Sequence, residues 1–293
     1  MMANARSWRV VALGFLLIAG SSLLLMSCGG GDRRGTRGRT ITIKGSDTMV
    51  ILGQRWAENY MREHPGCVVQ VTGGGSGVGI AALINGGTDI CASSRPIKDK
   101  EKEQVRARHG REVTEIPVAL DGIAIFLNEA NPVEELDLEQ IEAVYRGRIT
   151  DWKDLGGQPG KIICYGRENN SGTYMYFKEH VLKNQDFAAE VQTLPGTAAV
   201  INAVLKDKMA IGYGGIGYSK GVKAIKVAAR KGDKSVAPDM EHVVAGTYPI
   251  SRKLFFYTIG EPAGEAKAFI EWVLSEEGQK ICQEVGYYPL RRK

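Results

Sequence analysis

The chain has 293 residues, of which 43% are hydrophobic and 24% are charged, and its formal net charge is +5. These values are typical of soluble globular proteins, and the length suffices for two α/β lobes that each have their own core. The positive charge is too small to indicate nucleic-acid binding, and no basic stripe with interleaved aromatic residues occurs.

The N-terminal segment predicts export. Arg6 and Arg9 precede an apolar run over 10–25 that only Gly and Ser interrupt. At about 16 residues this run is short for a membrane span, which needs about 20. A basic start, an apolar core and a small residue before Cys28 are typical of a cleaved signal, and Cys28 resembles the cysteine of a lipoprotein box. The alternative is a retained membrane helix.

From this pattern we expect residues 1–27 to be a lipoprotein signal peptide. Residues 28–39 would be a lipidated cysteine and a flexible basic tether, because the segment after Cys28 has no apolar residue to pack. The protein would then be anchored by lipid to a bacterial membrane, facing the periplasm or the cell exterior.

Strands that end in turns rich in Gly, Ser and Thr follow the tether. The predicted strands are 40–43, 68–72 and 88–92. The turns carry Ser46, Asp47 and Thr48, then Ser76 and Gly77, and then Ser94 and Arg95. Turns of this kind place ligand sites at the carboxyl edge of an α/β sheet.

A further turn, over 166–173, is the most informative stretch of the chain. Arg167 lies four residues before Ser171, Gly172 and Thr173, at the start of a predicted helix over 174–183. The unpaired N–H groups of a helix start, two hydroxyls and a guanidinium suit a tetrahedral oxyanion. An ordinary capped helix with a surface arginine is the alternative, but the repetition of such turns favours anion binding.

Strands and helices alternate along the rest of the chain, which predicts parallel sheets with right-handed crossovers. The predicted strands are 123–128, 161–165, 209–213 and 254–258, and the predicted helices are 137–146, 197–205 and 263–282.

Several stretches together resemble the phosphate-binding proteins of bacterial ABC-type phosphate importers. They occur in family order, from about residue 40 to the end of the chain, at 45–48, 73–79, 92–96, 119–124, 149–157, 167–173 and 275–280. The resemblance implies a two-lobed, type II-like periplasmic-binding-protein fold, with the ligand cleft between lobes joined by two crossing segments. We expect lobe I to comprise 40–123 and 248–293, and lobe II to comprise 124–247.

The resemblance also implies the ligand and the partners. The expected phosphate-binding residues are Ser46, Asp47, Thr48, Ser76, Gly77, Ser94, Arg95, Arg167, Ser171, Gly172 and Thr173. The lobes would close on the anion, and the monomer would dock on the permease of an importer that a separate ATPase drives. We expect neither partner to be encoded here, since the chain has no P-loop and, once processed, would have no membrane span. Alternatives are another tetrahedral oxyanion such as sulfate or molybdate, or a phosphate-sensing or surface protein.

Selection of phosphate over sulfate requires an acceptor for the proton that phosphate keeps at neutral pH. Some relatives have an aspartate where this chain has Ser94. Asp47 and Asp121 are the remaining candidates, although Asp47 could instead cap its helix and Asp121 could instead pair with an arginine of the cleft.

Other motifs do not indicate catalysis or cofactors. Residues 212–217 match a dinucleotide fingerprint, but 218–221 interrupt the helix that should follow, so a packed glycine turn is favoured. No histidine neighbours the serines of the turns, their sequence does not match a nucleophile elbow, and no metal-ligand spacing occurs. We therefore expect no enzyme, with a phosphatase as the less favoured alternative, and no metal or cofactor.

Overall fold

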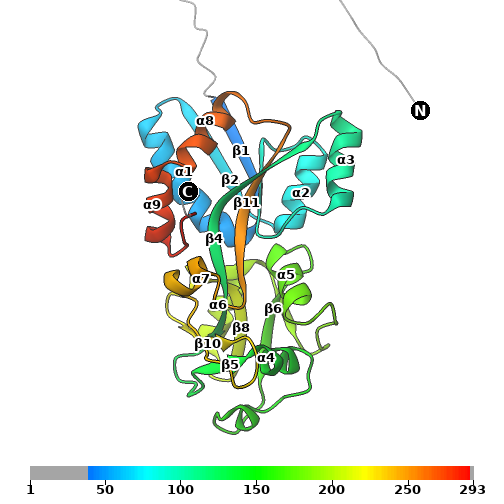
Figure 1. The fold of residues 1–293 in the computed structure, drawn as a ribbon, viewed down its shortest axis with the longest axis vertical. Coiled ribbons are helices and arrows are strands. Elements are labelled where there is room, and N and C mark those ends of the chain that lie inside the picture. Colours follow the sequence, from blue (N-terminus) through cyan, green and yellow to red (C-terminus); the bar gives the residue numbers. More distant parts are fainter. Residues whose placement is uncertain (1–38, 291–293) are drawn as a thin grey trace, which may run out of the picture. The chain divides into compact units, whose positions relative to one another are not determined.

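The computed structural model describes residues 39–290 (Figure 1). The expected signal peptide, Cys28 and all of the expected tether except Arg39, which begins the first strand, lie outside these residues. Within 39–290, no helix has the length and apolar character that a membrane crossing requires.

The described strands vary in length from two residues to fifteen. They are β1 (Arg39–Gly45), β2 (Cys67–Thr72), β3 (Ile90–Ser93), β4 (Val113–Leu127), β5 (Glu135–Asp137), β6 (Ile163–Arg167), β7 (Gln192–Leu194), β8 (Ala210–Gly215), β9 (Lys223–Ala224), β10 (Lys226–Ala228) and β11 (Ser251–Ile259).

Helices connect most of these strands. The α-helices are α1 (Val50–Glu63), α2 (Ser76–Ile84), α3 (Asp99–His109), α4 (Leu138–Tyr145), α5 (Gly172–His180), α6 (Gly196–Lys206), α7 (Met240–Ala245), α8 (Gly264–Val273) and α9 (Glu276–Val285). Short 3₁₀ helices are η1 (Asp47–Met49), η2 (Trp152–Leu155) and η3 (Ile216–Tyr218).

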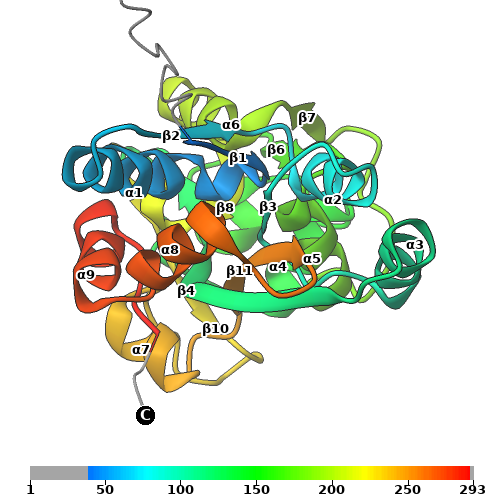
Figure 2. The same ribbon diagram turned by 90° about the horizontal axis from the view of Figure 1, so that it is seen from above.

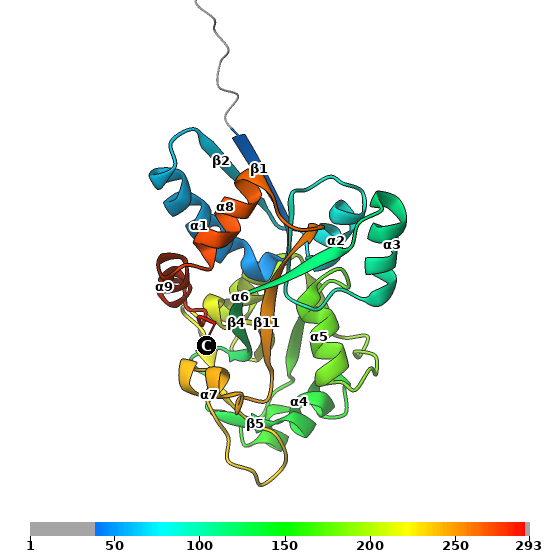
Figure 3. The same ribbon diagram turned by 45° about the horizontal axis from the view of Figure 1, so that its top comes forward.

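The main sheet has the strand order β2-β1-β3-β11-β4-β8-β6-β7, with β9 paired to β4. Its two ends are parallel, as the alternation of strands and helices predicts: β1 pairs with β2 and β3, and β6 pairs with β7 and β8. The antiparallel strands β4 and β11 lie between them and run side by side through the middle of the molecule (Figures 1 and 3). These two strands are the crossing segments.

Strand β4 contributes to both halves because its pairing changes along its length. Its first part, Val113 to Gly122, pairs with β11, and its last five residues pair with β8. Figure 2 shows α1, α8 and α9 on one side of the β1–β3 strands, with α2 and α3 on the other. The chain therefore covers both faces of its parallel strands with helices, as α/β proteins do.

Separate hydrophobic cores support the two-lobed arrangement. One large core takes residues from 41 to 119 and from 254 to 287, including Trp56 and Phe256. The other takes residues from 123 to 250 together with Tyr288. The cores divide along β4 and β11, and we propose lobe I as 40–123 with 248–293, and lobe II as 124–247. Ile123, Tyr248, Ile250 and Tyr288 of the proposed lobe I pack in the core of lobe II.

The C-terminal helix differs from the prediction. A single helix over 263–282 was expected, whereas the structure has α8 and α9, separated at Leu274 and Ser275. The Ser275 hydroxyl caps α9 by accepting a hydrogen bond from the Gly278 N–H at 3.3 Å. A Cβ on Gly278 would lie 2.6 Å from the Val273 Cα, so glycine permits the close turn between the two helices. A serine cap thus restarts the helix in a new direction.

Candidate functional site

Three serine hydroxyls from lobe I meet in the interior. The Ser46 hydroxyl donates to the Ser94 Oγ at 2.8 Å, and the Ser76 Oγ lies 3.3 Å from the same atom. The Ser94 N–H also donates to the Ser76 Oγ at 3.0 Å. Each serine follows a different parallel strand, β1, β2 or β3. Because the carboxyl ends of these strands share one edge of the sheet, the topology itself gathers the hydroxyls.

Two threonines extend this group across to lobe II. The hydroxyls of Thr48 and Thr173 are 2.8 Å apart, and both residues are buried. We call Ser46, Thr48, Ser76, Ser94 and Thr173 the hydroxyl cluster. Ser76 and Gly172 are the first residues of α2 and α5, so their N–H groups have no carbonyl partner within the helix. The cluster therefore combines hydroxyls with two helix N-termini, which favour an anion.

The start of α5 is shaped for close approach to the cluster. The Ser171 Oγ accepts from the N–H groups of Thr173 and Tyr174, at 3.2 and 3.3 Å, and so caps the helix. A Cβ on Gly172 would lie 2.7 Å from the Ser94 Oγ and still closer to the Ser76 Oγ. Only glycine fits at this position, because any side chain would displace the serine hydroxyls.

Arg167 brings a buried positive charge to the site. Its side chain is 1% exposed, and it donates to Asp47 Oδ2 at 2.5 Å and to Thr197 Oγ1 at 2.8 Å. Asp47 Oδ1 in turn accepts from the Gly74 N–H at 2.7 Å. Within residues 39–290, the Arg167 Nε is buried and has no hydrogen-bond partner. An unsatisfied buried donor is costly, so this atom is a natural contact for an acceptor from a ligand.

Arg252, which the sequence reasoning missed, is the second guanidinium beside the cluster. It lies on β11 directly opposite Asp121 on β4, and its Nε and Nη2 donate to Asp121 Oδ2 at 2.9 and 2.7 Å. Its Nη1 donates to the Ser94 carbonyl at 2.9 Å, and its Nη2 also donates to Thr173 Oγ1 at 3.0 Å. The arginine therefore joins the crossing strands to hydroxyl-bearing turns of both lobes. The sequence gives little signal for it, because Arg252 stands between Ser251 and Lys253, ahead of the apolar part of the strand.

Asp121 is fully buried behind Arg252. Burial raises the pKa of its carboxyl above the ordinary value, although the Arg252 guanidinium and the Ile216 N–H, which donates to Oδ1 at 3.1 Å, both lower it. The alternative given for Asp121, a pairing with an arginine of the cleft, is thus observed, and the partner is Arg252.

Arg95 is directed elsewhere. Its guanidinium forms a bidentate pair with Glu101, at 2.8 and 2.7 Å, and donates to the Pro96 carbonyl at 2.9 Å. Glu101 is held at the start of α3, where its carboxylate also accepts from the Lys98 N–H at 2.8 Å. The position beside the hydroxyls that was expected for Arg95 is taken by Arg252.

Gly77 also differs in its surroundings from the expectation. Its N–H donates to the Asn170 carbonyl at 2.9 Å, so its close approach is to the backbone of lobe II.

The glycines of the fingerprint at 212–217 permit close packing. A Cβ on Gly212 would lie 2.7 Å from Val200, and one on Gly214 would lie 2.8 Å from Thr197.

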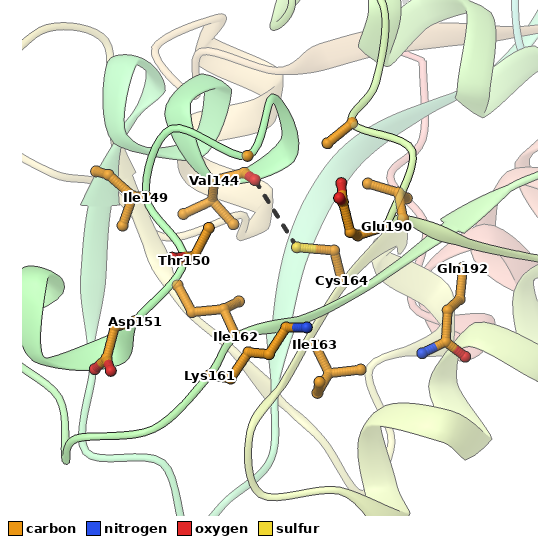
Figure 4. A pocket seen from close by; sticks show the side chains of 13 residues that line it. Val144, Ile149, Thr150, Asp151, Lys161, Ile162, Ile163, Cys164, Glu190 and Gln192 are labelled. Carbon is orange, nitrogen blue, oxygen red and sulfur yellow. Dashed lines mark hydrogen bonds between the residues drawn. The ribbon is translucent and has the colours of Figure 1, made fainter.

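A cavity of about 480 Å³ lies in lobe II, away from the hydroxyl cluster (Figure 4). Val144, Ile162 and Cys164 form part of its wall, and Lys161 and Glu190 line it as well. Burial raises the pKa of the Cys164 thiol to about 12, so this thiol is protonated at neutral pH and is a poor nucleophile. In the described part of the chain, no group of three or more His, Cys, Asp or Glu residues is arranged to hold a metal ion.

Comparison with known proteins agrees with this geometry. Residues 31–277 match the PBP superfamily domain. The phosphate-binding protein PstS of Pseudomonas aeruginosa is 35% identical over 266 residues, covering 85% of this chain and 82% of the relative. PstS of Staphylococcus haemolyticus is 30% identical, covering 96% of this chain and 92% of the relative. The chain belongs to the family of phosphate-binding proteins of ABC-type phosphate importers.

Solved structures of this family share the fold. A candidate phosphate ABC transporter substrate-binding protein from Clostridium perfringens, solved with bound phosphate, aligns with a TM-score of 0.78 and 31% identity, covering 86% of this chain and 100% of the other. An ABC-type phosphate transport receptor from Vibrio cholerae aligns with a TM-score of 0.67 and 33% identity, covering 85% and 100%. The type II-like periplasmic-binding-protein fold predicted from the sequence is confirmed.

Proposed function

We propose that the chain binds inorganic phosphate between its lobes and delivers it to an ABC-type importer. The observation that carries the proposal is the hydroxyl cluster with two buried guanidiniums: that of Arg252 donates to Thr173, and that of Arg167 donates to Asp47, which lies between Ser46 and Thr48 in the chain. Hydroxyls, helix N-termini and guanidiniums all donate hydrogen bonds, and a tetrahedral anion accepts from every side. The family membership of the chain supports the same ligand.

The proposed ligand set follows from these positions. Arg167 and Arg252 supply charge, and the remaining donors are hydroxyls or backbone N–H groups of Ser46, Thr48, Ser76, Ser94, Ser171, Gly172 and Thr173. Bound phosphate would replace the bonds that the hydroxyls now make with one another, and one of its oxygens would satisfy the Arg167 Nε. Arg95 is omitted because Glu101 already holds its guanidinium.

We propose Asp47 as the acceptor of the phosphate proton. Its side chain is 18% exposed. Its Oδ1 accepts one hydrogen bond, from the Gly74 N–H, and its Oδ2 accepts one, from the Arg167 guanidinium. A carboxylate has about four acceptor sites, so Asp47 has capacity left. Asp121 is less suited because Arg252 stands between it and the cluster hydroxyl of Thr173.

This assignment predicts selectivity for phosphate. Sulfate at neutral pH carries no proton, so it would place an unprotonated oxygen against the Asp47 carboxylate and be repelled. We expect sulfate and molybdate to leave phosphate binding unchanged at equal concentration in a competition titration with radiolabelled phosphate. Displacement of half of the phosphate by equimolar sulfate would contradict the role of Asp47 and favour a general oxyanion site.

We assign no catalytic step, since the relatives are named as binding proteins and the cluster serines have hydroxyl and guanidinium neighbours rather than a histidine base.

We propose that the monomer closes on phosphate by bending at the crossing strands β4 and β11. The closed form would then dock on a permease that a separate ATPase drives.

For location, binding proteins of this family act outside the cytoplasm, and we propose that Cys28 anchors this one. We expect the intact mass of membrane-extracted protein to show that residues 1–27 are absent and that more than one acyl chain is attached. A single acyl chain holds a protein at a membrane only weakly. A Cys28→Ala variant that is processed normally and stays at the membrane would refute lipid anchoring.

A further inference from the structure

The glycine-rich turn at the start of α2 contacts a second turn, from lobe II, just ahead of α5. Figure 3 shows α5 below α2. The Gly77 N–H donates to the Asn170 carbonyl at 2.9 Å, and the Asn170 side-chain Nδ2 donates to the Gly74 carbonyl at 3.2 Å. The two hydrogen bonds join residues 93 and 96 positions apart in the chain, one on each side of the cleft. They connect the lobes without using any group of the proposed ligand set.

The glycines of the turn leave the space that this contact occupies. A Cβ on Gly75 would lie 2.7 Å from the Asn170 carbonyl oxygen, and a Cβ on Gly77 would lie 3.1 Å from it. Gly75 also has a φ of 96°, which itself favours glycine, but Gly77 is an ordinary helical residue of α2. Nothing in its own backbone requires glycine at position 77. The requirement comes from the opposing lobe.

The opposing turn is held by backbone and capping hydrogen bonds. The Ser171 N–H donates to the Glu168 carbonyl at 3.0 Å, which closes the turn, and Ser171 then caps α5. The Asn170 carbonyl is thereby held in line with the N-terminus of α2, whose partial positive charge favours it. The contact also has a cost, because the Asn170 Oδ1 is buried without a partner in the described structure. This cost opposes the attraction and favours release of the contact.

We propose that Asn170 and Gly77 form an interlobe latch that sets how long the cleft stays closed, with Gly77 as a positioning residue that does not contact phosphate. The inference rests on the proposed phosphate function. Larger side chains at position 77 should hold the lobes apart when the cleft is closed and leave the open form unaffected. Phosphate would then enter as before but leave sooner.

The test compares Gly77→Ala and Gly77→Val with Ala81→Val, a control that places the same valine on the exposed face of α2. Stopped-flow mixing of the processed protein with inorganic phosphate gives both rate constants. We expect Gly77→Val to raise the dissociation rate about tenfold, equivalent to about 1.4 kcal/mol, with Gly77→Ala between it and wild type. The association rate should stay within about twofold, since opening is not impeded.

A dissociation rate of Gly77→Val equal to that of Ala81→Val would overturn the latch, as would a slower association with unchanged dissociation. Small-angle scattering without phosphate is a second readout. If the wild-type protein fails to bind phosphate, the proposed function is refuted, and the scattering comparison then tests the latch by itself. The latch holds part of the phosphate-free wild-type population closed, so it predicts that Gly77→Val is more expanded on average than Ala81→Val, and identical profiles would refute it.

Discussion

Replacing Arg167 by alanine should weaken phosphate binding by about 2–5 kcal/mol, the cost of truncating one member of a buried, hydrogen-bonded charge pair. The side chain is 1% exposed, so water cannot replace the lost donors. The change also leaves Asp47 without its cation, and an unpaired carboxylate beside the cluster repels an anion. Titration calorimetry with phosphate gives the loss directly.

Two further variants show whether the loss at position 167 reflects geometry as well as charge. Arg167→Lys keeps the charge but loses the planar fork that binds Asp47 and Thr197 together, and it should recover only part of the affinity. Arg55→Ala is the matched control, because Arg55 is half exposed on α1 and its ion pair among the described residues is with Glu58. Unchanged affinity in Arg167→Ala would remove Arg167 from the ligand set.

Replacing Asp121 by asparagine should lower the free energy of unfolding by about 3–5 kcal/mol, since it leaves the Arg252 charge buried without a counter-ion. Asp121 is fully buried and the Arg252 side chain is 2% exposed. Urea unfolding of the variant and of wild type at neutral pH measures the difference. A loss below about 1 kcal/mol would indicate an exposed pair of the ordinary surface kind.

The effect of Asp121→Asn should depend on pH in a defined direction. Burial raises the pKa of Asp121 above its value in the unfolded chain. Its contribution is therefore fully present below the unfolded pKa and is lost as the pH rises through the folded pKa. As the pH falls, Asp121 takes up a proton more readily in the folded than in the unfolded chain, so wild type gains stability and its stability difference from Asp121→Asn should widen.

A double variant separates stability from binding at the crossing strands. Asp121→Leu with Arg252→Met replaces the pair by apolar side chains, which often preserves stability. We expect its unfolding free energy to be closer to wild type than that of Asp121→Asn. Phosphate affinity should nevertheless fall, because the donor to Thr173 and the Ser94 carbonyl is gone.

The sequence predicted the strand–turn–helix units because each has local signals: an apolar strand, a Gly/Ser/Thr turn and a helix with apolar residues at helical spacing. These units place Ser46, Ser76 and Ser94 together through the parallel pairing of β1 with β2 and β3. Arg167 was recognised from its spacing to Ser171. The resemblance added the ligand and the lobes.

Arg252 and Arg95 show what local signals cannot supply. Whether an arginine reaches the cluster depends on the register of β11 against β4, which places Arg252 opposite Asp121 and is a property of the assembled sheet. Arg95 lies next to a cluster serine in sequence, yet the start of α3 places Glu101 within reach of its guanidinium. Tertiary pairing thus decided which arginine serves the site.

The central claim is that the hydroxyl cluster and its two guanidiniums form a phosphate site, and calorimetric titration of phosphate-stripped protein tests it most directly. Stripping by unfolding and refolding in phosphate-free buffer removes any anion carried through purification. We predict saturable binding of one phosphate per chain, weakened by Arg167→Ala and unaffected by Arg55→Ala. Absence of heat on phosphate addition, or equal binding by Arg167→Ala and wild type, would contradict the account.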